Sequence, residues 1–186
     1  MSSSAPSAAP VVYDFDPAHS AAHFSVRHMM ISNVKGEFTK VSGTVTFSPN
    51  NLAASRIEAT IDTTSIRTRD DQRDAHLKSA DFLDVAKYPE IRFVSKSIDS
   101  RGEGEYRVRG DLTIHGVTKE VTLDVDSVTP EVKDPWGNIR LGAAATTKID
   151  REDFGLHWNV ALETGGVLVG KQVSISLEVE LTRRAA

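Results

Sequence analysis

The chain contains no cysteine among its 186 residues, and this absence removes several kinds of site at once. Without thiols there is no disulfide framework, no thiolate metal site and no cysteine nucleophile. Long apolar runs are also lacking, since no window approaches the ~18 consecutive apolar residues of a transmembrane helix. The net charge of -4 is small and its signs are interspersed, which argues against nucleic acid as a partner. These absences predict a soluble protein with no membrane span and no nucleic-acid partner.

Recognisable catalytic motifs are missing as well. There is no Gly-x-Ser-x-Gly turn for a serine nucleophile, and no glycine-rich loop that would hold a phosphate. Six histidines are present, but none belongs to a His-Glu-x-x-His zinc helix: His19 and His23 are four residues apart, yet they straddle an expected strand start. We therefore expect no enzyme activity, no catalytic residues, no metal site and no cofactor. One alternative stays open, in which His28, His76 or His115 serves as an acid–base group or metal ligand, because a barrel brings distant residues together.

Residues 1–10 are rich in Ser, Ala and Pro, without a basic start or an apolar run. Such a segment can bury almost nothing, so we expect a disordered tail. It lacks the features of a secretory signal, which predicts a cytoplasmic protein, or a periplasmic one if an export signal has been removed. Residues 11–184 show no internal repeat and no shift in composition, and are expected to form a single domain.

From Tyr13 onward, apolar and polar residues alternate along most of the chain. In the run 173–181, Val, Ile and Leu stand at odd positions and Ser and Glu at even ones. A period of two is typical of antiparallel strands that bury one face. Roughly eight such runs, separated by Gly-, Pro- and Asn-rich turns, predict a sandwich or a closed barrel. Closure is favoured, because a strand as long and regular as 173–181 would leave an unprotected edge in an open sheet.

The segment 65–93 is the one long interruption of this alternation. Thr68 and Asp71 have capping-box spacing, which predicts a helix that starts near them, and Pro89 must end it before strand pattern resumes at Ile91. A single helix in a β chain often closes the mouth of a cavity. Arg73 and His76 lie three residues apart and would share a helix face.

The apolar residues near the expected strand ends exceed what a tightly filled barrel needs. Together with a helical lid they indicate an elongated apolar cavity with a few polar groups at one end. Polar head-group candidates are His28, Arg73 and His76. Strand parity assigns the cavity lining to Phe24, Val26, Phe38, Val45, Phe47, Ile61, Phe82, Phe93, Leu112, Ile114, Phe154 and Trp158.

Several sequence blocks occur in an order and spacing that resemble a known family. These are residues 16–20 (DPAHS), 24–29 (FSVRHM), 73–82 (RDAHLKSADF), 88–93 (YPEIRF), 110–118 (GDLTIHGVT), 134–137 (DPWG), 149–156 (IDREDFGL) and 168–170 (LVG). Over about residues 13–181 the chain resembles the YceI-like family of lipid-binding, lipocalin-like barrels.

The resemblance implies an all-β fold with one short helix, an extended antiparallel eight-stranded barrel that encloses an apolar tunnel. It also implies a homodimer and a long-chain ligand, and supplies no catalytic residues. We therefore expect a protein that binds and sequesters or carries a polyisoprenoid, a quinone, or a ligand of the fatty-acid or amide type. The alternatives are an enzyme for a small amphipathic substrate and a stress-related binding protein for drug-like molecules.

Overall fold

The computed structural model describes residues 9–186, so most of the tail expected at 1–10 lies outside the described residues. The strands are β1 (Val11–Phe15), β2 (Ala21–His28), β3 (Ser32–Phe38), β4 (Val41–Phe47), β5 (Arg56–Asp62), β6 (Ile66–Arg67), β7 (Glu90–Gly102), β8 (Glu105–Ile114), β9 (Val117–Asp126), β10 (Val132–Lys133), β11 (Ile139–Asp150) and β12 (Val169–Arg183). The helices are α1 (Asp71–Lys78) and the short 3-10 helices η1 (Leu52–Ala54), η2 (Thr63–Ser65) and η3 (Arg151–Phe154).

Eight strands close into an antiparallel barrel, as the alternation predicted. Around the ring the hydrogen-bonded order is β1, β4, β5, β7, β8, β9, β11 and β12, and β12 returns to β1. The prediction that the run 173–181 is paired on both edges is confirmed, since β12 pairs with β11 on one side and with β2 and β1 on the other. Closure leaves this long apolar strand with no free edge.

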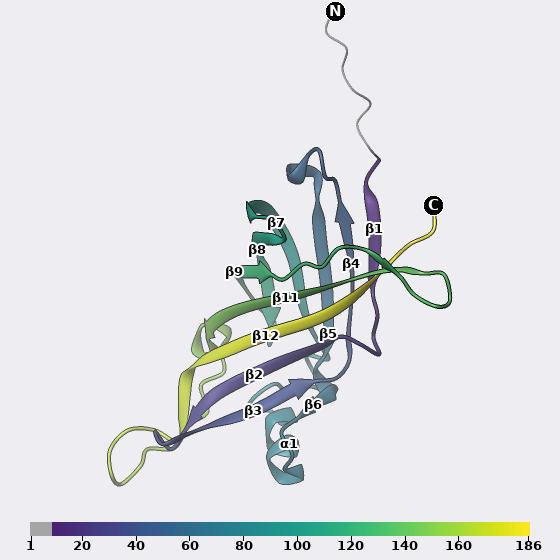
Figure 1. Cartoon of the computed structure of the whole chain (residues 1–186). Coiled ribbons are helices and arrows are strands. Elements are labelled where there is room, and N and C mark those ends of the chain that lie inside the picture. Colours follow the sequence, from purple (N-terminus) through teal and green to yellow (C-terminus); the bar gives the residue numbers. More distant parts are fainter. Residues whose placement is uncertain (1–8) are drawn as a thin grey trace, which may run out of the picture.

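A long arm extends the barrel at one end. It consists of β2, β3 and the first half of β12, where residues 169–178 of β12 pair with β2 and β2 pairs with β3. We call these three segments the arm. In Figure 1 the arm runs to the lower left, and the β2–β3 turn lies there beside the loop 157–168. The hydrogen bond from the Met29 amide to the Leu168 carbonyl, at 2.8 Å, joins turn and loop.

The expected helix is present, but its N-cap differs from the prediction. Asp70, and not Thr68, is the cap: its carboxylate accepts a hydrogen bond from the Arg73 amide at 2.9 Å. Thr68 accepts a bond from the Arg73 guanidinium instead and donates to Asp74. Thr68 and Asp70 both have side chains that can cap a helix and are only two residues apart, so spacing alone could not show which of them is the N-cap. The resumption of strand pattern after Pro89 is confirmed, because β7 begins at the next residue.

Helix α1 has eight residues. Among residues 9–186, no helix combines the length and the apolar character that crossing a membrane requires.

A charged side chain is buried directly after the end of β11. Arg151, in η3, is 4% exposed. Its guanidinium donates to the carbonyls of Leu156 at 2.6 Å, Gly170 at 2.8 Å and Val169 at 3.3 Å. Desolvation lowers the pKa of Arg151 from its ordinary value. The side chain therefore ties the turn after β11 to the start of β12, using the planar fork that only arginine offers.

We predict that Arg151→Met lowers the free energy of unfolding by about 3 kcal/mol, because three carbonyl groups lose a charged donor while staying partly buried. Urea denaturation followed by circular dichroism measures the change. Arg109→Met is the matched control, since Arg109 is exposed and bonds only to Ser97. Equal stability of the two variants would contradict this role for Arg151.

Candidate functional site

The interior of the barrel contains an apolar cavity of about 390 Å³. Every strand of the ring contributes to its wall, and Leu77 of α1 adds to it. Apart from two tyrosines, the lining side chains that carry polar groups are His23, Thr147 and Arg151. Small-molecule sites have volumes of about 300–1,000 Å³ and mostly apolar walls, so the cavity is of a size that holds a ligand.

The wall follows from strand parity. Successive side chains of a strand point to opposite faces, so the apolar set of each alternating run faces inward. Ten residues expected from the sequence to line the cavity lie on its wall: Phe24, Val26, Phe38, Val45, Phe47, Ile61, Phe82, Phe93, Leu112 and Ile114.

The two other residues of the expected lining lie elsewhere. Phe154 belongs to η3, is 1% exposed and packs in the hydrophobic core. Trp158 follows η3 in a segment without strand structure. Neither is among the residues that line the cavity. Parity assigns a direction only within strands, and both residues stand outside them; so does Phe82, which reaches the wall from the turn after α1.

Trp158 instead joins an aromatic cluster on the helix. Its ring lies edge-on to His76, with centroids 4.6 Å apart, and 5.2 Å from the ring of Phe82. His76 and Phe82 are themselves 5.1 Å apart, and the His76 ring pairs with Asp81 at 2.8 Å. Because Phe82 lines the cavity, we call His76, Phe82 and Trp158 the aromatic clamp: it holds α1 and the following turn across one end of the barrel, where Figure 1 places the helix.

None of the three head-group candidates lies on the cavity wall. The Arg73 guanidinium donates to the side chain and carbonyl of Thr68, and His76 belongs to the aromatic clamp. His28 ends β2, opposite Val169 of β12. The polar wall residues that the sequence did not single out are His23, Thr147 and Arg151. Because His23 stands between the apolar residues Ala22 and Phe24, the alternation predicted that it faces solvent. Arg151 is charged, and nothing in the sequence around it indicates that it is buried.

Two glycines keep the interior open. A Cβ on Gly36 would collide with the ring of Phe24, and one on Gly110 would lie 2.6 Å from Cζ of Phe93. Gly36 is directly opposite Phe24 in the β2–β3 pair. Both phenyl rings therefore lie against bare backbone on the neighbouring strand, and they occupy less of the cavity than rings projecting inward would.

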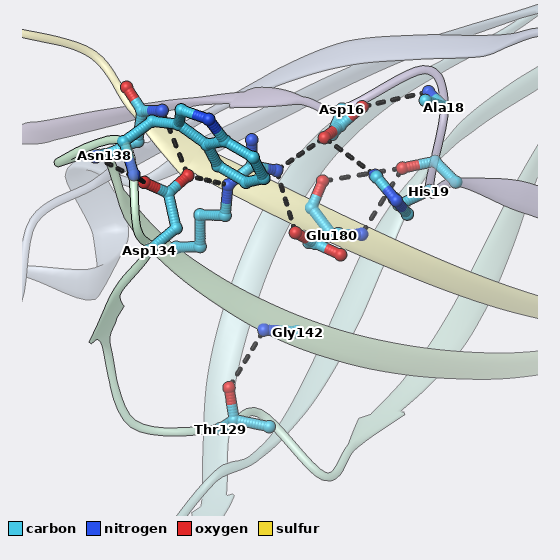
Figure 2. Close-up of polar contacts among 11 residues, drawn as sticks. Asp16, Ala18, His19, Thr129, Asp134, Asn138, Gly142 and Glu180 are labelled. Atoms are coloured by element: carbon cyan, nitrogen blue, oxygen red, sulfur yellow. Dashed lines mark hydrogen bonds and ion pairs between the residues drawn. The ribbon is translucent and has the colours of Figure 1, made fainter.

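A second group of polar residues lies at the other end of the barrel. Arg140 of β11 donates from Nη1 to Asp16 and, at 2.8 Å, to Glu180, and from Nε to Asp134 at 2.7 Å. His19 pairs with Asp16 at 3.0 Å. Figure 2 shows Asp134 on one side of this group and Asp16, His19 and Glu180 on the other. We call these five residues the Arg140 network; it joins the β1–β2 bend, β12 and the loop before β11.

Within residues 9–186, the network also contains a group of metal-ligating type. Donor atoms of Asp16, His19 and Glu180 lie within 4.8 Å of one another. The Arg140 guanidinium already bonds to both carboxylates, so a cation at this position would have to displace a bound positive charge. The arrangement therefore fits a structural latch better than a metal centre.

The network perturbs the titration of its members. The hydrogen bonds from Arg140 and then His19 lower the pKa of Asp16 to about 2. Burial raises the pKa of Asp134, but hydrogen bonds from Asn138 and Arg140 outweigh it and hold that pKa well below its usual range. The pKa of His19 is raised, first by its bond to Asp16 and then by the charge of Glu180. All three shifts favour the charged forms.

We predict that Arg140→Met destabilises the protein at pH 5 to 6 and that the difference from wild type shrinks as the pH falls from about 4 to about 2. A lowered carboxyl pKa stabilises the fold above the unfolded pKa, and this contribution is lost as protonation proceeds toward the folded pKa of about 2 for Asp16. Urea denaturation at a series of pH values measures it.

The control is Arg183→Met, because the exposed Arg183 makes only a 3.4 Å ion pair with Glu131. We expect its effect to be small at every pH. A difference between Arg140→Met and wild type that stays constant down to pH 2 would contradict the linkage to the network carboxylates.

The geometry defines a class of protein, a closed antiparallel β-barrel with an apolar cavity inside. The family model described as YceI-like domain matches residues 13–181, and the chain belongs to the YceI-like family. This confirms the resemblance seen in the sequence.

Curated relatives match over most of their length. A UPF0312 protein of Vibrio cholerae is 39% identical over 152 residues, which cover 82% of this chain and 80% of the relative. A UPF0312 protein of Staphylococcus aureus is 39% identical over 170 residues, which cover 91% of this chain and 96% of the relative.

Solved structures share the fold. Burkholderia cenocepacia BcnA superposes with a TM-score of 0.75 at 26% identity, over 89% of this chain and 98% of its own. The YceI protein of Campylobacter jejuni superposes with a TM-score of 0.71 at 30% identity, over 86% of this chain and 90% of its own. A polyisoprenoid binding domain from Saccharophagus degradans superposes with a TM-score of 0.66, over 92% of this chain and 98% of its own. Its sequence identity is 16%, so this similarity shows the fold alone.

Proposed function

We propose that this protein binds one long-chain apolar molecule inside the barrel and sequesters or carries it. The observation that carries the proposal is the cavity, whose wall is apolar except for a few side chains. The polyisoprenoid binding domain of similar fold from Saccharophagus degradans supports a polyisoprenoid as the ligand class, and quinones or fatty-acid and amide chains share its chemistry.

The physical basis of affinity is the removal of apolar surface from water. Each CH₂-sized group buried contributes about 0.8 kcal/mol, so a chain of modest length offsets the cost of association. Polar groups on the wall are few, and those of His23 and Arg151 have partners within the protein: His23 faces Glu37, and Arg151 donates to three carbonyls. Recognition would therefore depend on chain length and shape more than on hydrogen bonds.

The histidines support a binding protein over an enzyme. The three that could act as acid–base groups lie on separate elements: His28 at the end of β2, His76 in α1 and His115 in the turn between β8 and β9. His76 is engaged with Asp81, and His115 stacks on Tyr88 with centroids 4.6 Å apart. A homodimer and a cytoplasmic location stay predictions that light scattering and cell fractionation test.

Native mass spectrometry of the freshly purified protein, followed by solvent extraction, tests the proposal. We expect a stoichiometric long-chain lipid or quinone to be released. The proposal would be wrong if the protein carried no such compound and also failed to take up added polyprenol, ubiquinone and fatty amide.

A cavity-filling variant tests the location of the ligand. Ala145 is 8% exposed and lies on the cavity wall, opposite Leu177 in the β11–β12 pair. We predict that Ala145→Phe lowers the bound fraction of ligand at least about tenfold, because the ring displaces several buried chain carbons.

Thr146→Phe is the matched control, since Thr146 is the next residue of the same strand and is exposed. It adds the same side chain outside the barrel and should leave ligand binding unchanged. Thermal denaturation checks that both variants are folded. Equal loss or equal retention of ligand by the two folded variants would argue against binding in the cavity.

A further inference from the structure

The far end of the arm exposes a cluster of apolar side chains. Met29, Met30 and Ile31 form the turn between β2 and β3, and their exposed fractions are 42%, 54% and 74%. Val160, in the neighbouring loop, is 46% exposed. We call these four residues the arm tip. Single exposed apolar residues are ordinary on protein surfaces, but three consecutive ones on a protruding turn call for an explanation.

The conformation of the turn does not account for the methionines. Met29 has φ of 50° and Met30 has φ of 64°, so both adopt the left-handed conformation. The bond from the Ile31 amide to the His28 carbonyl makes Met29 and Met30 the central residues of a tight turn, and positive φ at both central positions strongly prefers Asn-Gly, because a Cβ is disfavoured there. The turn would form more easily with other residues. Met30 lies against Gly166 of the neighbouring loop, whereas the exposed parts of all three apolar side chains point to a role outside the fold.

Three backbone polar groups of the turn 29–31 are paired within the protein. The Met29 amide donates to the Leu168 carbonyl, and the Ile31 amide donates to the His28 carbonyl at 3.1 Å. The Met30 carbonyl accepts a bond from the Arg27 guanidinium at 3.2 Å. A segment with paired backbone groups can enter an apolar phase without the penalty that unpaired ones carry.

The hairpin side of the arm tip is basic. Residues 27–35 contain Arg27 and Lys35 and no acidic residue, the neighbouring loop 157–168 contains the single acidic residue Glu163, and the whole chain has a net charge of -4. Basic residues that flank an apolar protrusion are attracted to anionic lipid headgroups and gain about 1 kcal/mol each near such a surface. This local reversal of sign favours an anionic membrane surface as the partner.

The size of the arm tip also favours a membrane over a protein. A specific protein interface buries about 800 Å² on each partner, well beyond what four partly exposed side chains on a narrow turn can supply. Shallow insertion of a few apolar side chains, in contrast, is a common mode of attachment to the lipid interface.

The cavity wall extends toward the arm tip. Val26 and Val169 both line the cavity. Val26 is three residues before Met29 in β2, and Val169 pairs with His28 and directly follows Leu168, whose carbonyl accepts from the Met29 amide. The apolar surface of the arm tip therefore adjoins one end of the apolar cavity.

We propose that the arm tip inserts into the surface of an anionic lipid membrane and that an apolar ligand passes there between the bilayer and the cavity. The transfer step rests on the proposed function, whereas membrane attachment stands independently of it. Attachment is reversible, because the inserted apolar area is small.

Co-sedimentation with vesicles tests attachment. The probes are vesicles of phosphatidylcholine alone and vesicles of phosphatidylcholine with phosphatidylglycerol. We expect the wild-type protein to bind the anionic vesicles more strongly, and the binding to weaken as salt is raised. Met29→Asn/Met30→Gly should bind at least about tenfold more weakly, because two inserting side chains are lost. This variant supplies the residues that the turn prefers but removes the Met30 contact with Gly166, so thermal denaturation checks that it is folded.

The matched control is Val132→Ser/Trp136→Ser. Val132 and Trp136 are 61% and 81% exposed and belong to the green segment at the right of Figure 1, away from the arm. This control should bind vesicles as wild type does. Equal vesicle binding by all three proteins would overturn the proposal. A wild-type dimer that ignores vesicles and dissociates in the Asn-Gly variant would overturn it too, and would identify the arm tip as an interface between copies.

Ligand content separates this proposal from the proposed function. Native mass spectrometry in solution should find the same ligand in wild type and in Met29→Asn/Met30→Gly, while transfer of that ligand class from donor vesicles should slow in the variant. Retained ligand without vesicle binding would refute only the membrane proposal. Vesicle binding by a protein that never holds a ligand would refute the proposed function and leave attachment standing.

Discussion

The pairing of β12 on both edges is the constraint on which the rest of the structure depends. Its residues 172–182 are paired with β11, while its other edge pairs first with β2 and then with β1. A barrel with a filled interior is stabilised mainly by side-chain contacts across its core. Here the interior is partly empty, so the continuous hydrogen-bonded ring has to fix the position of the wall. The Arg140 network stabilises the same ring from outside, since it joins β12 to the β1–β2 bend and to the loop before β11.

Much of this arrangement was predictable because a strand has a period of two. Phe93 and Leu112 pair across β7 and β8 and both face the cavity, as their parity required. The two misplaced residues lie where no strand fixes the direction of a side chain: Phe154 is in a 3-10 helix and Trp158 is in an irregular segment. Phe82 also lies outside the strands, and parity does not account for its place on the wall. Thr68 was mistaken for the helix cap because Asp70 offers an equally good acceptor two residues later.

Features that depend on contacts between remote segments could not be read from the sequence. Arg151 is buried because carbonyls from Leu156, Val169 and Gly170 converge on its guanidinium. The local sequence around Arg151 does not predict these contacts. The role of Gly36 is hidden in the same way. Its contact with Phe24 depends on the register of β2 against β3, and a shift of one residue would place a side chain under the ring.

With an apolar cavity inside, the stability of the barrel would depend on whether a ligand fills that cavity. Empty space in a protein core forfeits packing contacts that filled space would have, and this loss grows with the volume left unfilled. Because domains are stable by only about 5–15 kcal/mol, contacts regained in the cavity matter to the stability of the fold. An apolar chain in the cavity restores the missing contacts, so a ligand that fits would stabilise the barrel as it binds. Because the wall offers few polar groups, this gain increases with the buried length of the chain and is nearly indifferent to its headgroup. Under the proposed loading at the arm tip, a cavity with little chemical selectivity would gain specificity from the place at which it meets its ligand.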